Sequence, residues 1–275
     1  MIRDTDTGRV RARRSLSQNF LIDHNIRRKL VATLEAEPHD TVLEVGPGHG
    51  ELSELIAGDV RRLVIIEKDD RLFERLTDRW GDRTDVEIVH ADALEIDLSE
   101  RARASGPLRV ISNVPYSITS PLLFRFLDIR PPASRILVVV QEEVGRRIVA
   151  DPGTREYGAL SVGVRARAEA RLAFRIGRQV FRPVPDVRSA AVLIDPFPEE
   201  LSSRRAEALR ALTRVAFSRR RKQLRGILRD APEYALTSGA AESLLIELKI
   251  DPSARPETLG PEVFLRLADR LATPA

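Results

Sequence analysis

The chain contains no cysteine among its 275 residues. This absence excludes disulfide bridges, thiolate nucleophiles and zinc sites with cysteine ligands. No apolar run approaches the roughly 20 residues that a helix needs to cross a bilayer, and the arginine-rich start at residues 1–14 lacks the apolar core of a signal peptide. We therefore expect a soluble, cytoplasmic protein with no membrane partner, whose chemistry depends on other side chains.

Histidine is also scarce and scattered along the chain. The four histidines follow neither an H-x-x-E-H pattern nor any related spacing of metal ligands. The sequence therefore predicts that no metal is bound.

Positive charge is concentrated in two places. The chain has 45 basic and 41 acidic side chains and a net charge of only +4. Residues 1–30 nevertheless contain eight basic and three acidic side chains, and residues 219–225 contain five basic ones. Such clusters favour a polyanionic partner such as nucleic acid. The alternative is a general preference for arginine codons, because only four of the 45 basic residues are lysine.

Short apolar segments alternate with amphipathic ones over the first half of the chain. With 43% hydrophobic and 31% charged residues, a chain of this length can bury a large core. Alternation of this kind predicts an α/β fold with a doubly wound, mostly parallel sheet that is covered on both faces. We expect helices at 24–37 (after Asp23 and before Pro38), 51–57, 69–80 and 120–127, and strands at 41–45, 62–67, 86–90, 108–112 and 135–140.

The pattern changes after the segment D-P-F-P at 195–198. Before it, we expect a charged helix at 142–150, a segment of small residues at 157–168, and an antiparallel pair of strands at 172–176 and 190–194. After it, four segments are predicted to be helices, at 204–217, 219–229, 240–248 and 261–271. We therefore expect a basic arm at 1–22, a sheet domain at 23–198 and a small all-α domain at 199–275.

Three successive strand ends carry residues suited to binding a nucleoside. The first is followed by E-V-G-P-G-H-G at 44–50, where Gly46 allows a tight turn and close approach of a ligand. Glu67 can accept hydrogen bonds from both ribose hydroxyls, and Asp92 can accept one from the exocyclic amine of adenine. Taken singly, the loop could be a structural turn and the acids solvated strand ends. Together they resemble the cofactor site of S-adenosylmethionine-dependent methyltransferases. The loop is not the dinucleotide fingerprint G-x-G-x-x-G, which argues against a dehydrogenase.

The segment N-V-P-Y at 113–116 follows the fourth strand. An exocyclic aromatic amine is a poor nucleophile because its lone pair is delocalised into the ring. The side-chain carbonyl of Asn113 and the backbone carbonyl of Val114 can accept from both N–H groups and favour a pyramidal nitrogen. Tyr116 offers a ring on which a flipped base can stack. This segment therefore predicts methylation of an adenine amine.

With these segments in place, the chain resembles the ribosomal RNA adenine dimethyltransferases that act on the small subunit. L-S-Q-N-F-L at 16–21 is similar to the family's opening motif, 44–50 to its cofactor loop and 110–123 to its catalytic segment. Q-E-E-V at 141–144, Y-G-A-L-S-V at 157–162, F-R-P-V-P at 181–185 and a basic segment at 216–222 follow in the family's order. The resemblance implies a Rossmann-like methyltransferase domain at 23–198, a cofactor-covering motif within 1–22, and a helical RNA-binding domain at 199–275.

The resemblance also implies the roles of individual residues. S-adenosylmethionine would be held by six residues: Asn19, Leu21 (through its backbone), Gly46, Glu67, Asp92 and Asn113. Asn113 and Tyr116 would hold the target adenine, and Phe181 would cover the other face of the base. Phe181 could equally be a core anchor of the closing strand. The implied reaction is in-line attack of adenine N6 on the sulfonium methyl, with positioning as the main catalytic device.

Two residues depart from the family pattern. Ser17 stands where glycine is usual, so the N-terminal loop is less free to adopt positive φ there. Ser117 follows Tyr116 where asparagine is common. Both changes affect the expected loop geometry and leave the reaction class unchanged.

The implied substrate is 16S ribosomal RNA in the small ribosomal subunit, in which adjacent adenines would be dimethylated at N6 during ribosome biogenesis by a monomeric enzyme. We expect phosphate contacts from five residues of the second basic cluster: Arg219, Arg220, Arg221, Lys222 and Arg225. The alternative is that they form a solvated helix face. Two other functions stay open: a large-subunit adenine methyltransferase of the macrolide-resistance type, and a mainly non-catalytic ribosome-assembly factor.

Overall fold

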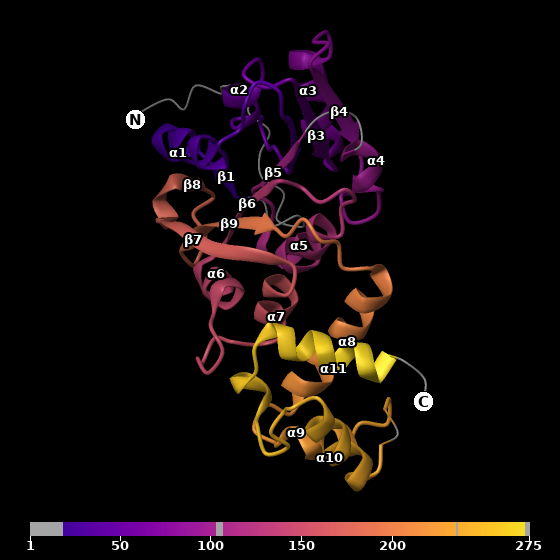
Figure 1. Ribbon diagram of the computed structural model, residues 1–275. Coiled ribbons are helices and arrows are strands. Elements are labelled where there is room, and N and C mark those ends of the chain that lie inside the picture. The colour runs from indigo at the N-terminus through magenta and orange to yellow at the C-terminus, as the bar shows by residue number, and fades with distance from the viewer. Residues whose placement is uncertain (1–18, 103–106, 235, 273–275) are drawn as a thin grey trace. The chain divides into compact units, whose positions relative to one another are not determined.

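The computed structural model describes residues 19–102, 107–234 and 236–272 (Figure 1). Ser17 and most of the expected basic arm lie outside these residues. The chain divides into two compact units. The first unit consists of Met1–Gly145 and Arg171–Pro196, and the second consists of Arg146–Ala170 and Phe197–Ala275.

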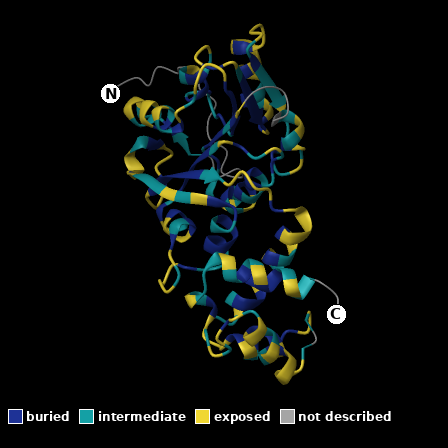
Figure 2. Cartoon of the chain, viewed as in Figure 1, coloured by how far each residue is buried: buried dark blue, intermediate teal, exposed yellow. Residues whose placement is uncertain are grey.

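The first unit contains a seven-stranded sheet with the strand order β4-β3-β2-β5-β6-β9-β7. The first five strands in that order are parallel, and β9 runs antiparallel to β6. Apolar runs fill the central strands, which are buried (dark blue in Figure 2) because both faces of the sheet are covered. The predicted doubly wound sheet is therefore confirmed. The strands are β2 (Thr41–Val45), β3 (Arg62–Glu67), β4 (Val86–His90), β5 (Leu108–Ser112), β6 (Arg135–Gln141), β7 (Ala168–Ile176) and β9 (Ser189–Pro196).

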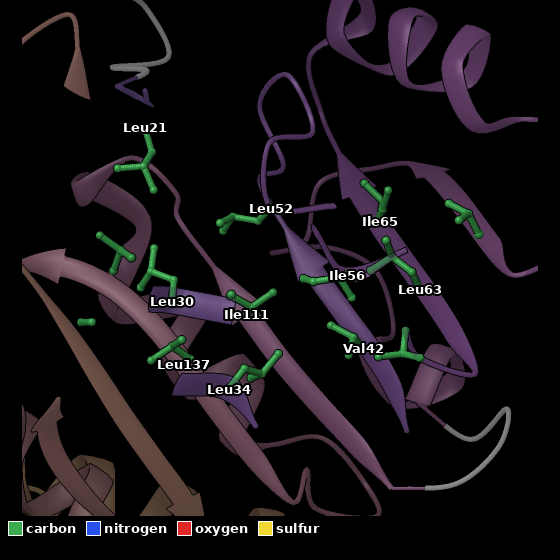
Figure 3. Close-up of a cluster of buried hydrophobic side chains, with 14 of the residues drawn as sticks. Leu21, Leu30, Leu34, Val42, Leu52, Ile56, Leu63, Ile65, Ile111 and Leu137 are labelled. Atoms are coloured by element: carbon green, nitrogen blue, oxygen red, sulfur yellow. The ribbon is translucent and has the colours of Figure 1, made fainter. Parts of the chain in front are cut away.

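Helices of the first unit pack apolar side chains onto this sheet. The side chain of Asp23 accepts a hydrogen bond from the Ile26 amide at 2.9 Å and so begins the first helix. Figure 3 shows side chains of this helix and of the short second helix beside apolar residues of the strands, in one buried cluster. The helices are α1 (His24–Leu34), α2 (Ser53–Ile56), α3 (Asp70–Trp80), α4 (Leu98–Ala102), α5 (Thr119–Leu127) and α6 (Glu142–Val149), which continues into the second unit.

A separate two-stranded sheet lies at the start of the described chain. β1 (Phe20–Leu21) pairs antiparallel with β8 (Phe181–Arg182), with Leu21 opposite Phe181. The sequence analysis did not predict this pairing, because two-residue strands have no recognisable periodicity. It connects the segment before α1 to the loop between β7 and β9.

The second unit is helical around a core of its own. Its helices are α7 (Ala159–Arg165), α8 (Ser203–Ser218), α9 (Leu224–Arg229), α10 (Ser238–Glu247) and α11 (Pro261–Ala272). Tyr157 and Val162 are buried in one cluster with Leu212 and Phe264, and the Tyr157 hydroxyl donates to the Leu259 carbonyl at 2.8 Å. Residues 146–170, which the sequence analysis assigned to the sheet domain, therefore belong to this compact unit.

The prediction of a single helix at 219–229 is wrong for residues 219–223. α8 ends at Ser218, residues 219–223 form a turn, and α9 begins at Leu224. The first amides of α9 donate outside the helix, from Leu224 to the Ala254 carbonyl at 2.8 Å and from Arg225 to the Pro252 carbonyl at 3.2 Å. These tertiary hydrogen bonds satisfy amides that a continuous helix would have used internally. In the described part of the chain, no helix is long and apolar enough to span a bilayer.

Candidate cofactor site

A cavity of about 220 Å³ lies at the carboxyl edge of the parallel strands in the first unit. The six predicted cofactor residues all line it: Asn19, Leu21, Gly46, Glu67, Asp92 and Asn113. They come from five separate segments of the chain. The strand register explains this convergence, because parallel strands end at one edge of the sheet and ligands of open α/β sheets bind there.

Close packing of the glycine loop leaves little room for a side chain at Gly46 or Gly48. Gly46 has φ +73°, and a Cβ atom there would lie 2.7 Å from Cγ1 of Val114. Gly48 has φ +61°, and its Cβ would lie 3.0 Å from the ring of Phe20. Both conformations favour glycine. The loop backbone therefore lies directly against two other segments that line the cavity.

Glu67 is held rigidly at the end of β3. Its Oε1 accepts hydrogen bonds from the backbone amides of Lys68 at 2.9 Å and Asp69 at 2.8 Å. Burial raises the pKa of this carboxyl to about 7, although the amide hydrogen bonds oppose the shift. The group can therefore change its ionisation near neutral pH while keeping its position.

Asp92 is paired with a residue that the sequence analysis missed. Its Oδ1 accepts from the Leu94 amide at 2.9 Å, and its Oδ2 lies 2.6 Å from Nζ of Lys68, which also lines the cavity. Burial disfavours ionisation of Asp92, but these hydrogen bonds outweigh it and hold its pKa below the usual range. Lys68 directly follows Glu67, and that position at a strand end was the signal that could have identified it.

Asn113 lies in the cavity wall immediately after β5. The preceding Ser112 is buried and donates its hydroxyl to the Val45 carbonyl at 3.1 Å, which joins this segment to the start of the glycine loop. Tyr116 is half-buried, and its hydroxyl lies 2.6 Å from Oγ of Ser189 on β9. Burial raises the pKa of Tyr116 against the opposing effect of that hydrogen bond. Asn113 and Ser117 line the cavity, whereas Tyr116 stands beside it.

The position of Phe181 differs from the one expected of a residue that covers the target adenine. Its side chain is 1% exposed, belongs to the buried cluster of the first unit and is absent from the cavity wall. Pairing of β8 with β1 turns this ring into the core. The position agrees with the alternative interpretation, a core anchor, because an apolar ring is more stable when buried.

Glu44 is the first residue of the glycine-loop motif, and its position was not predicted. It is 1% exposed on β2, and Ser53 donates its hydroxyl to Oε2 of Glu44 at 2.6 Å. Burial raises the pKa of Glu44 to about 8. Burial therefore favours the protonated form of Glu44 at neutral pH, and Glu44 is absent from the cavity wall.

The basic cluster of the second unit divides into bracing and exposed side chains. Arg219 donates to the Asp230 carbonyl at 2.9 Å, and Arg220 donates to the carbonyls of Arg155 at 2.7 Å and Thr154 at 2.8 Å. The other three are exposed: Lys222 lies 3.5 Å from Asp230, Arg225 lies 3.9 Å from Glu242, and no partner of the Arg221 side chain is found in the described residues. The described part of the chain contains no group of three or more histidine, cysteine, aspartate or glutamate side chains that could hold a metal ion.

Known proteins resemble the chain over almost its whole length. A family model described as ribosomal RNA adenine dimethylase matches residues 9–273. Ribosomal RNA small subunit methyltransferase A of Nitratidesulfovibrio vulgaris (strain DP4) is 40% identical over 267 residues, covering 96% of this chain and 98% of the relative. The protein of the same name from Geobacter metallireducens is 38% identical over 262 residues, covering 94% and 95%.

Two solved structures have a similar fold. A dimethyladenosine transferase from Plasmodium falciparum superposes with a TM-score of 0.77 at 23% identity, covering 90% of this chain and 95% of that one. The 23S rRNA methyltransferase ErmE superposes with a TM-score of 0.67 at 26% identity, covering 92% and 100%. The predicted Rossmann-like fold with a helical C-terminal part is thereby confirmed. Because the family model matches far more than half of its length, the chain belongs to the ribosomal RNA adenine dimethylase family.

Proposed function

We propose that this chain uses S-adenosylmethionine to dimethylate N6 of adjacent adenines in the 16S ribosomal RNA of the small subunit. The observation that carries the proposal is the convergence of Gly46, Glu67, Asp92 and Asn113 on one cavity. Relatives named small-subunit methyltransferases, at about 40% identity over most of both chains, support the substrate class.

The donor set of the cavity fits the proposed cofactor. Gly46 and Gly48 line the cavity at positive φ without side chains, so their backbone can approach a ligand closely. The carboxyl of Glu67 suits a ribose diol, and the low pKa of Asp92 suits acceptance from an adenine amine. When bound, S-adenosylmethionine supplies the methyl group.

The residues after β5 would hold the substrate amine. The side-chain carbonyl of Asn113 and the backbone carbonyl of Val114 accept its two N–H groups, which orients the nitrogen and favours its pyramidal form. Tyr116 provides a stacking surface, and Ser189 holds its ring through the 2.6 Å hydrogen bond. The protein thus acts by positioning and electrostatics.

Methyl transfer to subunit RNA tests this function. The full-length protein is incubated with labelled S-adenosylmethionine and either small subunits lacking the modification or large-subunit RNA, followed by nucleoside analysis. We expect N6,N6-dimethyladenosine in small-subunit RNA alone. Label in large-subunit RNA would instead favour an activity like that of ErmE, a 23S rRNA methyltransferase, and tight subunit binding without label would favour an assembly factor.

The variant Asn113→Ala separates catalysis from binding. We expect methyl transfer to fall at least about 100-fold, since an electrostatic contact to the reacting group is lost, while subunit binding is retained. Full activity in this variant would exclude the proposed role of Asn113.

For RNA binding, we propose that the exposed Arg221, Lys222 and Arg225 contact phosphates, whereas Arg219 and Arg220 brace the second unit. Replacing both Arg221 and Lys222 by glutamine should weaken subunit binding and lower its salt slope by about one unit per lost contact. Arg61→Gln controls for loss of a positive charge outside the cluster, because Arg61 is exposed at the amino end of β3, the end opposite the cavity. An unchanged salt slope in the double variant would exclude these contacts.

A further inference from the structure

Arg27 occupies an unusual position for a residue of a basic cluster. It lies in the first turns of α1, and its side chain is only 12% exposed. Nε and Nη2 donate to the carbonyl oxygen of Leu21 at 2.9 and 2.5 Å, and Nη2 lies 3.4 Å from Oε1 of Glu51. The sequence analysis counted Arg27 with the residues that favour a polyanionic partner, but its guanidinium is directed into the protein.

Both partners of Arg27 line the cofactor cavity. Leu21 belongs to the strap, which we define as residues 19–21, and Glu51 follows the glycine loop. The strap is held on its other side by the two-residue pairing with β8 and by a hydrogen bond from the Ile22 amide to the Val180 carbonyl at 2.8 Å. Such a short strand is weakly held by pairing alone. A single guanidinium therefore joins two walls of the cavity.

We propose that Arg27 is a positioning residue for the cofactor. It fixes the strap against the segment after the glycine loop, so that Asn19 and Leu21 remain at the cavity before the ligand arrives. This preorganisation lowers the entropy cost of binding. Two donors from one planar group on the same carbonyl require arginine, because the single ammonium of lysine cannot reproduce the arrangement. The proposal rests on the proposed cofactor site and adds a residue that does not itself line it.

The test compares Arg27→Gln with Arg27→Lys and with Arg28→Gln. Arg28 is the adjacent residue of the same helix and is exposed, so it controls for loss of one positive charge. Calorimetry measures the Kd of S-adenosylhomocysteine, and steady-state kinetics measure KM for cofactor and for small subunits separately. We expect Arg27→Gln to raise the cofactor Kd and KM on the order of tenfold, equivalent to about 1.4 kcal/mol. In Arg27→Gln the subunit KM should stay the same. Arg27→Lys should be intermediate, and Arg28→Gln should match the wild type in cofactor Kd and cofactor KM.

Two results would overturn the proposal. One is a lower Tm with an unchanged cofactor Kd, which would make Arg27 merely structural. The other is a higher subunit KM with an unchanged cofactor KM, which would make it an RNA contact. Should Arg27→Gln not fold, Glu51→Gln provides a second route. If the two side chains act together, Arg27→Lys should raise the cofactor Kd less in the Glu51→Gln background than in the wild type. Full additivity of the two changes in binding free energy would contradict the proposal. Failure of the proposed cofactor site, on which this proposal rests, looks different, since wild-type protein would then bind no S-adenosylhomocysteine.

Discussion

At the residue scale, the burial of Glu67 and its proposed contact with the cofactor together predict a pH dependence of cofactor binding. Its pKa is raised to about 7, mainly by burial, and the ionised form is the better acceptor of ribose hydroxyls. Cofactor affinity should therefore fall up to tenfold per pH unit below pH 7 and be constant above about pH 8. The low pKa of Asp92 keeps that carboxyl ionised throughout this range.

Calorimetry with S-adenosylhomocysteine between pH 5.5 and 8.5 measures this dependence, and buffers of different ionisation enthalpy report the proton released on binding. Glu67→Gln should bind more weakly at pH 8 and show a flat profile. A flat profile in the wild type would contradict the role given to Glu67.

Glu44 predicts the pH dependence of stability. Its pKa is about 8 in the folded protein against 4.5 in the unfolded chain, so the folded state holds the proton more tightly. The contribution of protonated Glu44 to the free energy of unfolding is therefore complete below pH 4.5 and is lost as the pH rises through 8. Glu44→Gln keeps an acceptor for Ser53 and carries no charge, so its Tm should exceed that of the wild type at pH 9 and be similar at pH 5. Thermal denaturation at both pH values checks this, and equal Tm values at pH 9 would contradict it.

Residues at strand ends could be placed from the sequence, whereas side-chain contacts with segments distant in sequence could not. Gly46, Glu67, Asp92 and Asn113 lie together because strand register decides their position. The inward direction of Arg27, and the choice between the two roles left open for Phe181, depend on contacts between segments distant in sequence, which local sequence does not encode.

At the scale of elements, buried strands were predicted with the right bounds because polar residues and turns flank their apolar runs. The bounds of β2 to β5 agree residue for residue with the prediction. The break between α8 and α9 was missed because it is stabilised by carbonyls of the Pro252–Ala254 loop, distant in sequence. Helical periodicity alone continues across such a break.

The glycine loop predicts a large stability effect at Gly50. Its φ is +82°, and a Cβ atom there would overlap Cη2 of the buried Trp80. Gly50→Ala should destabilise the protein by about 3 kcal/mol through backbone strain and overpacking. Gly153 is the matched control, because its φ is +84° and a Cβ there would meet no atom within 4 Å. Gly153→Ala should cost only about 1 kcal/mol. Urea unfolding of both variants measures the difference, and equal losses would contradict the packing argument.

At the scale of the whole molecule, the second unit is built from two stretches of chain that are separated in sequence. Tyr157 and Val162 of the first stretch share a buried cluster with Leu212 and Phe264 of the second. The expected boundary at 198 lies close to Phe197, where the chain enters the second unit for the second time. The sequence could not reveal that an earlier segment completes the core of this unit, because core membership depends on tertiary packing.

A chain that ends at Pro198 should therefore lose part of its structure. Tyr157 would lose the acceptor of its hydroxyl at Leu259 and its apolar neighbours. We expect this truncated chain to bind a hydrophobic dye and to unfold with lower cooperativity than the full chain. A piece comprising 199–275 should likewise fail to give a cooperative thermal transition. Sharp transitions in both pieces, at the temperatures of the full chain, would show that the boundary separates independent domains.

The pairing of Leu21 with Phe181 also has a consequence for synthesis of the protein. The strap that forms one wall of the cavity emerges from the ribosome early, but its partner strand emerges only after the parallel strands have been made. A nascent chain can therefore assemble the glycine loop and the acidic strand ends well before it can close the wall around them. The pairing of β1 with β8 is therefore a late step in building the site, although it joins two of its shortest strands.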